Sequence, residues 1–241
     1  MILDVLPEVE FVIGWGPGPD ALHGSPFFMR KPEDVEDFMV GPLAVQNPAL
    51  YLPDYKGKKV GIVVKGCDSR SVVQLIAENL IKREEVVIIG FPCDGVVDIA
   101  KVEDALSEFG DLGEVTGAEI GADEIKVTMS GKEHVIKMAD VQAEKCGRCG
   151  VPNAVISDHF AGIAKTATAG PDTFEDLKAL DTMSLEERFD FWSKEMRRCI
   201  RCYACRTPCP PCVCRAHCVA SSRVPPWISQ ANSPPAKLTF R

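Results

Sequence analysis

The sequence lacks the features of a membrane-embedded or secreted protein. Its longest apolar runs, of which residues 60–64 are typical, are far shorter than a membrane-spanning helix requires. The first eight residues, MILDVLPE, carry acids where a signal peptide would carry bases. Hydrophobic residues make up 46% of the chain and charged residues 26%, as in an ordinary globular protein. We therefore expect a cytoplasmic protein without membrane insertion.

The sequence also has no overall excess of positive charge. Its net charge is −8, which argues against a nucleic-acid-binding surface over most of the chain. Residues 194–241 hold nine Lys and Arg and one acid, a net charge of +8, so the other 18 bases and 34 acids give −16. A basic C-terminal segment therefore follows an acidic body, and nucleic acid is not an expected partner.

Histidine is scarce, with only four residues scattered along the chain, and no Ser–His–Asp or thiol-protease pattern is present. Cysteine, in contrast, is abundant. Of 11 cysteines, seven fall between Cys199 and Cys218. In a cytosolic chain such a cluster indicates metal binding rather than disulfides.

The middle of the body has the pattern of a strand–helix–strand unit. Residues 59–65 and 85–91 are apolar and rich in valine and isoleucine, as buried strands are. Between them, residues 68–84 carry apolar side chains at helical spacing, with a polar opposite face. A βαβ unit of this length places its two strands parallel.

The predicted fold is an α/β body over residues 1–190, followed by a small cysteine-rich, ferredoxin-like segment over residues 191–241. Other elements are predicted from local signals: a strand over 11–14 leading into a glycine-rich turn over 14–18, a helix starting at Pro32, a β-hairpin of 124–129 and 134–138, and a helix from the capping box at Ser184 to about Arg198.

The C-terminal run has the spacing C-x2-C-x2-C-x3-C-P, formed by Cys199, Cys202, Cys205 and Cys209 with Pro210. This is the spacing of bacterial ferredoxins, in which close thiolates hold a 4Fe–4S cubane. A zinc site would need only two C-x2-C pairs separated by a longer loop. The run therefore predicts an iron–sulfur cluster.

Further residues of this segment extend the prediction. In two-cluster ferredoxins the fourth cysteine of such a run ligates the other cluster, but no second run follows here. Cys212, Cys214 and Cys218 are therefore candidate ligands, members of a third site shared with a partner, or inert thiols. Arginines among the ligands could offset the negative charge of a cluster, or form a basic face for an acidic partner: Arg198, Arg201, Arg206 and Arg215.

The other four cysteines are dispersed but share a predicted location. Cys67 and Cys93 each follow one of the two predicted parallel strands and each precede an aspartate. Both should lie at the carboxyl edge of the sheet, where open α/β sheets hold ligands. Cys146 and Cys149 could complete four thiolates there. The alternatives are zinc, inert buried thiols, or a nucleophilic Cys67.

Three segments resemble the beta-subunit family of coenzyme F-420 hydrogenases and dehydrogenases. They are residues 65–71 (KGCDSRS), residues 90–95 (GFPCDG) and the Cys146/Cys149 pair. The C-terminal run and residues 225–227 (PPW) are similar to members that accompany heterodisulfide-reductase-like, hydrogenase or formate dehydrogenase subunits. The resemblance implies cluster ligation by Cys67, Cys93, Cys146 and Cys149.

The resemblance also implies a function, namely electron relay by an iron–sulfur subunit of an anaerobic oxidoreductase complex. We expect two 4Fe–4S clusters, with a third as an open alternative, and other subunits of the complex as partners. The alternative function is a flavin enzyme that oxidises or reduces a deazaflavin or a nicotinamide itself. The only hint of FAD is Gly14-x-Gly16-x-Gly18, which lacks the helix that follows in a dinucleotide fingerprint.

Overall fold

The computed structural model describes residues 1–121, 123–167, 174–210, 212 and 233. The chain divides into two compact units, Met1–Pro171 and Asp172–Arg241. The boundary between the units lies earlier in the sequence than the domain boundary expected near residue 190. Helices α6 (Glu175–Asp181) and α7 (Leu185–Arg197) therefore belong to the second unit.

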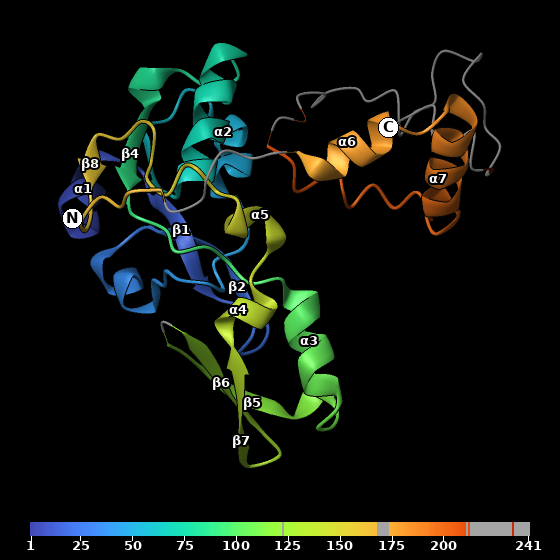
Figure 1. Ribbon diagram of the computed structural model, residues 1–241. Coiled ribbons are helices and arrows are strands. Elements are labelled where there is room, and N and C mark those ends of the chain that lie inside the picture. The colour runs from blue at the N-terminus through green and yellow to red at the C-terminus, as the bar shows by residue number, and fades with distance from the viewer. Residues whose placement is uncertain (122, 168–173, 211, 213–232, 234–241) are drawn as a thin grey trace. The chain divides into compact units, whose positions relative to one another are not determined.

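The first unit is built on a five-stranded sheet with the order β2-β1-β3-β4-β8 (Figure 1). β1, β3, β4 and β8 run parallel, and β2 pairs with β1 in the antiparallel direction at one edge. The strands are β1 (Val12–Pro17), β2 (Gly24–Met29), β3 (Val60–Val64), β4 (Val86–Gly90) and β8 (His159–Phe160). The parallel pairing predicted for the two central strands is confirmed.

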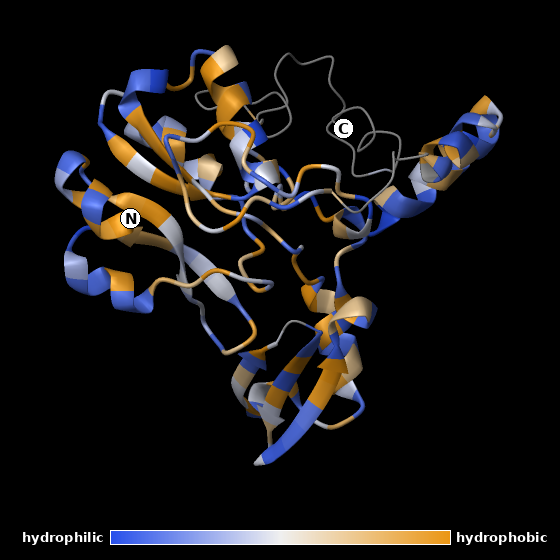
Figure 2. Ribbon diagram, turned by 60° about the vertical axis from the view of Figure 1, so that its left-hand side comes forward, coloured by the Kyte–Doolittle hydropathy of each residue, from blue (hydrophilic) through white to orange (hydrophobic). Residues whose placement is uncertain are grey.

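Both faces of this sheet are covered, which explains why β3 and β4 are apolar along their whole length (Figure 2). Ile62 and Val64 face a core shared with α2 (Gly66–Ala77) and the 3-10 helix η3 (Pro48–Tyr55). Val63 faces the opposite core. That core is shared with the N-terminal segments α1 (Ile2–Val5), η1 (Leu6–Glu8) and η2 (Pro32–Asp37), the last of which begins at the predicted Pro32.

The helix between β3 and β4 is shorter than the predicted 68–84. It ends at Ala77 because Asn79 adopts a left-handed conformation with φ 55°. The amide of Asn79 donates to the Ile76 carbonyl and that of Leu80 to the Leu75 carbonyl, as in a Schellman motif. Leu80 and the following Ile81 still pack in the core, so the apolar pattern of the sequence continues beyond the end of the helix. The 3-10 helix η4 (Arg83–Glu85) then leads into β4.

A second sheet of the same unit has the order β5-β6-β7 and is antiparallel. The predicted hairpin is confirmed, with a turn at Ser130 and Gly131 that have φ of 51° and 74°. Its apolar face packs against Val102 and Leu106 of α3. The elements of this part are α3 (Ile99–Ser107), η5 (Leu112–Glu114), β5 (Val115–Ile120), β6 (Glu124–Met129), β7 (Lys132–Lys137), α4 (Met138–Val141) and α5 (Glu144–Gly147).

The glycine-rich turn predicted over residues 14–18 is wrong, because β1 continues through Pro17. A Cβ atom at Gly14 would lie 2.7 Å from the Phe38 ring, and one at Gly16 would lie 2.9 Å from the Phe27 ring. These glycines therefore leave room for aromatic side chains over the sheet. No helix follows them, so they do not form a flavin fingerprint.

In the second unit, α7 begins at the predicted capping box. The Glu187 amide donates to Ser184 Oγ over 3.2 Å, and the Glu187 carboxylate accepts from the Ser184 amide over 2.8 Å. Among the described residues, no helix is long and apolar enough to cross a membrane.

Candidate metal centre

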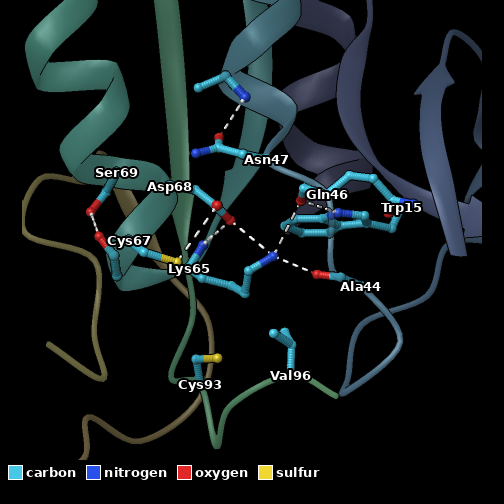
Figure 3. Close-up of polar contacts among 12 residues, drawn as sticks. Trp15, Ala44, Gln46, Asn47, Lys65, Cys67, Asp68, Ser69, Cys93 and Val96 are labelled. Carbon is cyan, nitrogen blue, oxygen red and sulfur yellow. Dashed lines mark hydrogen bonds and ion pairs between the residues drawn. The ribbon is translucent and has the colours of Figure 1, made fainter. Parts of the chain in front are cut away.

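The parallel strands bring Cys67 and Cys93 to the same edge of the sheet. β3 and β4 are in register from Val60 opposite Val86 to Val64 opposite Gly90. Cys67 and Cys93 therefore each lie three residues beyond the end of their strand, Cys67 in the first turn of α2. Figure 3 shows the two side chains near each other at this edge, as predicted from the sequence.

A segment that we call the strap, residues 151–160, lies along this edge and ends in β8. The Pro152 carbonyl accepts from the Cys93 amide over 2.8 Å, and the Val155 amide donates to Ser69 Oγ over 2.9 Å. The Val151 carbonyl lies so close to Gly66 that a Cβ there would be 2.0 Å from its oxygen. The strap thus fixes the backbone just after Cys149 against the start of α2.

Cys146 and Cys149 come from the short helix α5 and its end. The Val96 amide, just beyond Cys93, donates to Cys146 Sγ over 3.4 Å. The Cys149 amide donates to the Cys146 carbonyl over 3.2 Å, so the two cysteines share one turn. Hydrogen bonds and close contacts of the neighbouring backbone therefore connect four residues that we call the sheet-edge cysteines: Cys67, Cys93, Cys146 and Cys149.

Backbone amides point at three of these four sulfurs. Besides the bond to Cys146, the Gly95 amide donates to Cys93 Sγ over 3.3 Å and the Val151 amide donates to Cys149 Sγ over 3.4 Å. Amide donors to cysteine sulfur disperse thiolate charge and tune the potential of iron–sulfur centres. The loops thus supply the polar surroundings that a cluster needs.

The electrostatics of the thiols argue against nucleophilic chemistry at Cys67. Burial, followed by the negative charge of Asp68, raises the pKa of Cys67 to about 11, although Lys65 acts in the opposite direction. Burial also raises the pKa of Cys93, against the hydrogen bond from Gly95 and the charge of Lys65. A thiol of such high pKa is protonated at neutral pH, which argues against a nucleophilic Cys67. A bound metal centre would displace that proton.

The spacing of the side chains bears on which metal centre they fit. In the described part of the chain, no three Cys, His, Asp or Glu side chains gather as the ligands of a single ion do. A zinc ion draws four ligands to about 2.3 Å from one centre, whereas a cubane spreads its thiolates over different irons. The all-thiol donor set, with its amide donors, is one that a 4Fe–4S cubane takes.

The sequence did not reveal the buried ion pair beside these thiols. Lys65 and Asp68 are 3% and 1% exposed, and Lys65 Nζ lies 3.1 Å from Asp68 Oδ2. The Asp68 carboxylate also accepts from the Lys65 amide over 3.2 Å at the start of α2. A lysine directly after an apolar strand, three residues before an aspartate, is the signal that could have indicated it.

The C-terminal run lies in the second unit. Cys202, Cys205 and Cys209 are exposed, Cys199 and Cys212 are partly buried, and the predicted Cys214 and Cys218 lie outside the described residues. The chain forms a turn after Tyr203, whose carbonyl accepts from the Arg206 amide over 3.0 Å.

Among the arginines predicted to offset cluster charge, Arg198 forms an ion pair with Glu195. Arg201 and Arg206 are partly buried beside the run. The predicted Arg215 lies outside the described residues.

Comparison with known proteins identifies the family of this part of the chain. The family model for the C terminus of the coenzyme F420 hydrogenase/dehydrogenase beta chain matches residues 57–174, a range that contains all four of them. This segment belongs to that family. The family predicted from the sequence is thereby confirmed.

Curated relatives of the family extend over nearly the whole chain. The F420-dependent formate dehydrogenase 1 subunit beta of Methanococcus maripaludis is 22% identical, over 97% of this chain and 74% of the relative. The F420-dependent formate dehydrogenase subunit beta of Methanocaldococcus jannaschii is also 22% identical, over 97% and 75%.

The fold is shared with a solved structure. A chain of the F420-reducing NiFe hydrogenase complex of Methanosarcina barkeri superposes with a TM-score of 0.50 at 18% identity, over 63% of this chain. The present chain spans 57% of that chain. At this identity the likeness concerns the fold alone, and it agrees with the mixed α/β architecture described above.

Proposed function

We propose that the protein is an iron–sulfur electron-transfer subunit of a multi-subunit oxidoreductase. The observation that carries the proposal is the placement of Cys67 and Cys93 at one sheet edge, with Cys146 and Cys149 joined to the same loops and backbone amides donating to three of the four sulfurs. A cluster held there would accept and release one electron at a time. The chain's own residues would ligate it, shield it and tune its potential.

The second cluster of the proposal belongs to the C-terminal run, ligated by Cys199, Cys202, Cys205 and Cys209. Cys212, Cys214 and Cys218 remain additional candidate ligands, for this cluster or for a third. The exposure of Cys202, Cys205 and Cys209 suits a centre that exchanges electrons with a docked protein.

The relatives suggest the partners. Their printed names describe beta subunits of F420-dependent formate dehydrogenases, and the solved structure is an F420-reducing hydrogenase complex. We therefore propose a catalytic subunit of the formate dehydrogenase, hydrogenase or heterodisulfide-reductase type on one side. A deazaflavin-linked or protein carrier would stand on the other.

Metal analysis of anaerobically purified protein tests this function. We expect about eight iron atoms and eight acid-labile sulfides per chain, corresponding to two cubanes. Cys93→Ser should lose the iron of the body site and Cys202→Ser that of the C-terminal run, each about half of the total, with distinct losses in the electron paramagnetic resonance spectrum. Zinc without sulfide, or an unchanged iron content in both variants, would refute the proposal.

A further inference from the structure

The ammonium group of Lys65 is held in a fixed position beside the sheet-edge cysteines. Lys65 Nζ donates to the Ala44 carbonyl over 2.6 Å, pairs with Asp68 over 3.1 Å and lies 3.9 Å from the centroid of the Trp15 ring. Figure 3 shows Lys65 between Trp15 on one side and Cys67 and Cys93 on the other. These contacts leave the charge little freedom to move.

The start of α2 does not require this charge. Asp68 caps the helix by accepting from the backbone amide of Lys65, which any residue except proline would supply. Burying an ion pair costs desolvation, and apolar replacements of similar volume are often neutral or stabilising. A buried cation and anion next to Cys67 and Cys93 therefore call for an explanation other than stability.

The two charges lie at different places beside the thiols that follow the strands. Cys67 Sγ lies 3.7 Å from Asp68 Oδ1, so the negative end of the pair lies next to Cys67. The positive end is held at the Ala44 carbonyl and over the Trp15 ring.

We propose that Lys65 and Asp68 are positioning residues that set the reduction potential of the cluster held by the sheet-edge cysteines. This inference rests on the proposed function. Reduction brings one electron from a one-electron donor, which is oxidised in exchange, and adds a negative charge to an already anionic centre without making or breaking a bond. A fixed cation nearby favours that step and a fixed anion opposes it, most strongly where water is excluded.

Potentiometric titration of the full chain, followed by electron paramagnetic resonance, tests the proposal. Cys202→Ser serves as the parent, so that only the body site contributes to the signal. Lys65→Met should shift the midpoint potential to a more negative value, and Asp68→Asn should shift it to a more positive value. The double variant should lie between them, and Lys65→Arg should stay near the parent because it keeps the charge. Lys58→Met, which removes an exposed lysine paired with Glu10, is the matched control and should cause no shift.

The outcomes separate this inference from the function on which it rests. If the parent chain holds no iron, the proposed function fails. If the parent holds a cluster but both substitutions leave the potential unchanged, or shift it in the same direction, the pair is merely structural and the inference is overturned. If Lys65→Met loses its cluster, Asp68→Asn and Lys65→Arg decide: a positive shift in the first with a parental value in the second supports the proposal, and an unshifted Asp68→Asn overturns it.

Discussion

At Gly66 the strap and the first turn of α2 approach more closely than any side chain would allow. A Cβ atom there would lie 2.0 Å from the Val151 carbonyl oxygen and 2.8 Å from that of Asn153. We predict that Gly66→Ala pushes the strap away from α2 and separates Cys149 from Cys67. The variant should lose most of the iron of the body site and unfold at a lower temperature, measured by metal analysis and circular dichroism.

Two glycines beside Cys149 provide the controls. A Cβ at Gly147 or Gly150 would meet no atom within 4 Å. Gly147→Ala and Gly150→Ala should therefore keep their iron, and an iron-replete Gly66→Ala variant would show that the strap does not position Cys149.

Residue-level reasoning located the thiols but not the charges around them. Cys67 and Cys93 could be placed together because each follows an apolar strand, and parallel strands end at one edge. The burial of the Lys65–Asp68 pair could not be predicted in the same way. It depends on the Ala44 carbonyl and Trp15, which lie in segments distant in the sequence. Tertiary contacts of this kind leave no local pattern.

At the scale of elements, Asp158 fastens the strap to the sheet just before β8. Its carboxylate accepts from the Ile88 amide over 2.8 Å and pairs with Arg83. Burial alone would raise the pKa of Asp158, but the hydrogen bonds from Arg83 and Ile88 outweigh it and lower the pKa. The folded state therefore prefers the ionised carboxylate.

This preference predicts a pH dependence of stability. In the unfolded chain the pKa of Asp158 should be about 3.9. Its stabilising contribution is complete above that pH and declines as the pH falls through the lower folded pKa, since the unfolded chain then takes up the proton first. Urea unfolding should show a smaller loss of stability between about pH 5 and pH 2 for Asp158→Asn than for the parent. An unaltered pH profile for Asp158→Asn would contradict the assignment.

Element-level prediction succeeded where one local signal dominated. The Ser184 capping box correctly predicted the start of α7, and the Ser130-Gly131 turn correctly predicted the hairpin. The end of α2 was misplaced because Leu80 and Ile81 continue the apolar pattern into the core after Asn79 has ended the helix. The two-residue β8 carries too little sequence to be recognised without its partner β4.

At the scale of the whole molecule, charge divides the chain into an acidic body and a basic C-terminal segment, with net charges of −16 over residues 1–193 and +8 over residues 194–241. Such fields change the encounter rates of charged reactants and are screened by salt. We predict that dithionite, an anion, reduces the proposed C-terminal cluster faster than the proposed body cluster at low ionic strength. Reduced methyl viologen, a cation, should show the opposite order.

Stopped-flow reduction of two variants measures these rates separately, because Cys93→Ser should retain the proposed C-terminal cluster and Cys202→Ser the proposed body cluster. Added salt should bring the rates of the two reductants closer together. The same order of rates with both reductants would show that the charge division does not govern access to the clusters.

The spread of the ligands along the chain has a consequence for biogenesis. The sheet-edge cysteines span residues 67–149, and it is the parallel strands and the strap that bring them together. The C-terminal run occupies only residues 199–209, so its thiols are neighbours even in an extended chain. If both proposed clusters form, the C-terminal site can be loaded before folding and the body site only after it, so an iron–sulfur delivery system would have to recognise an unfolded and a folded target in one polypeptide.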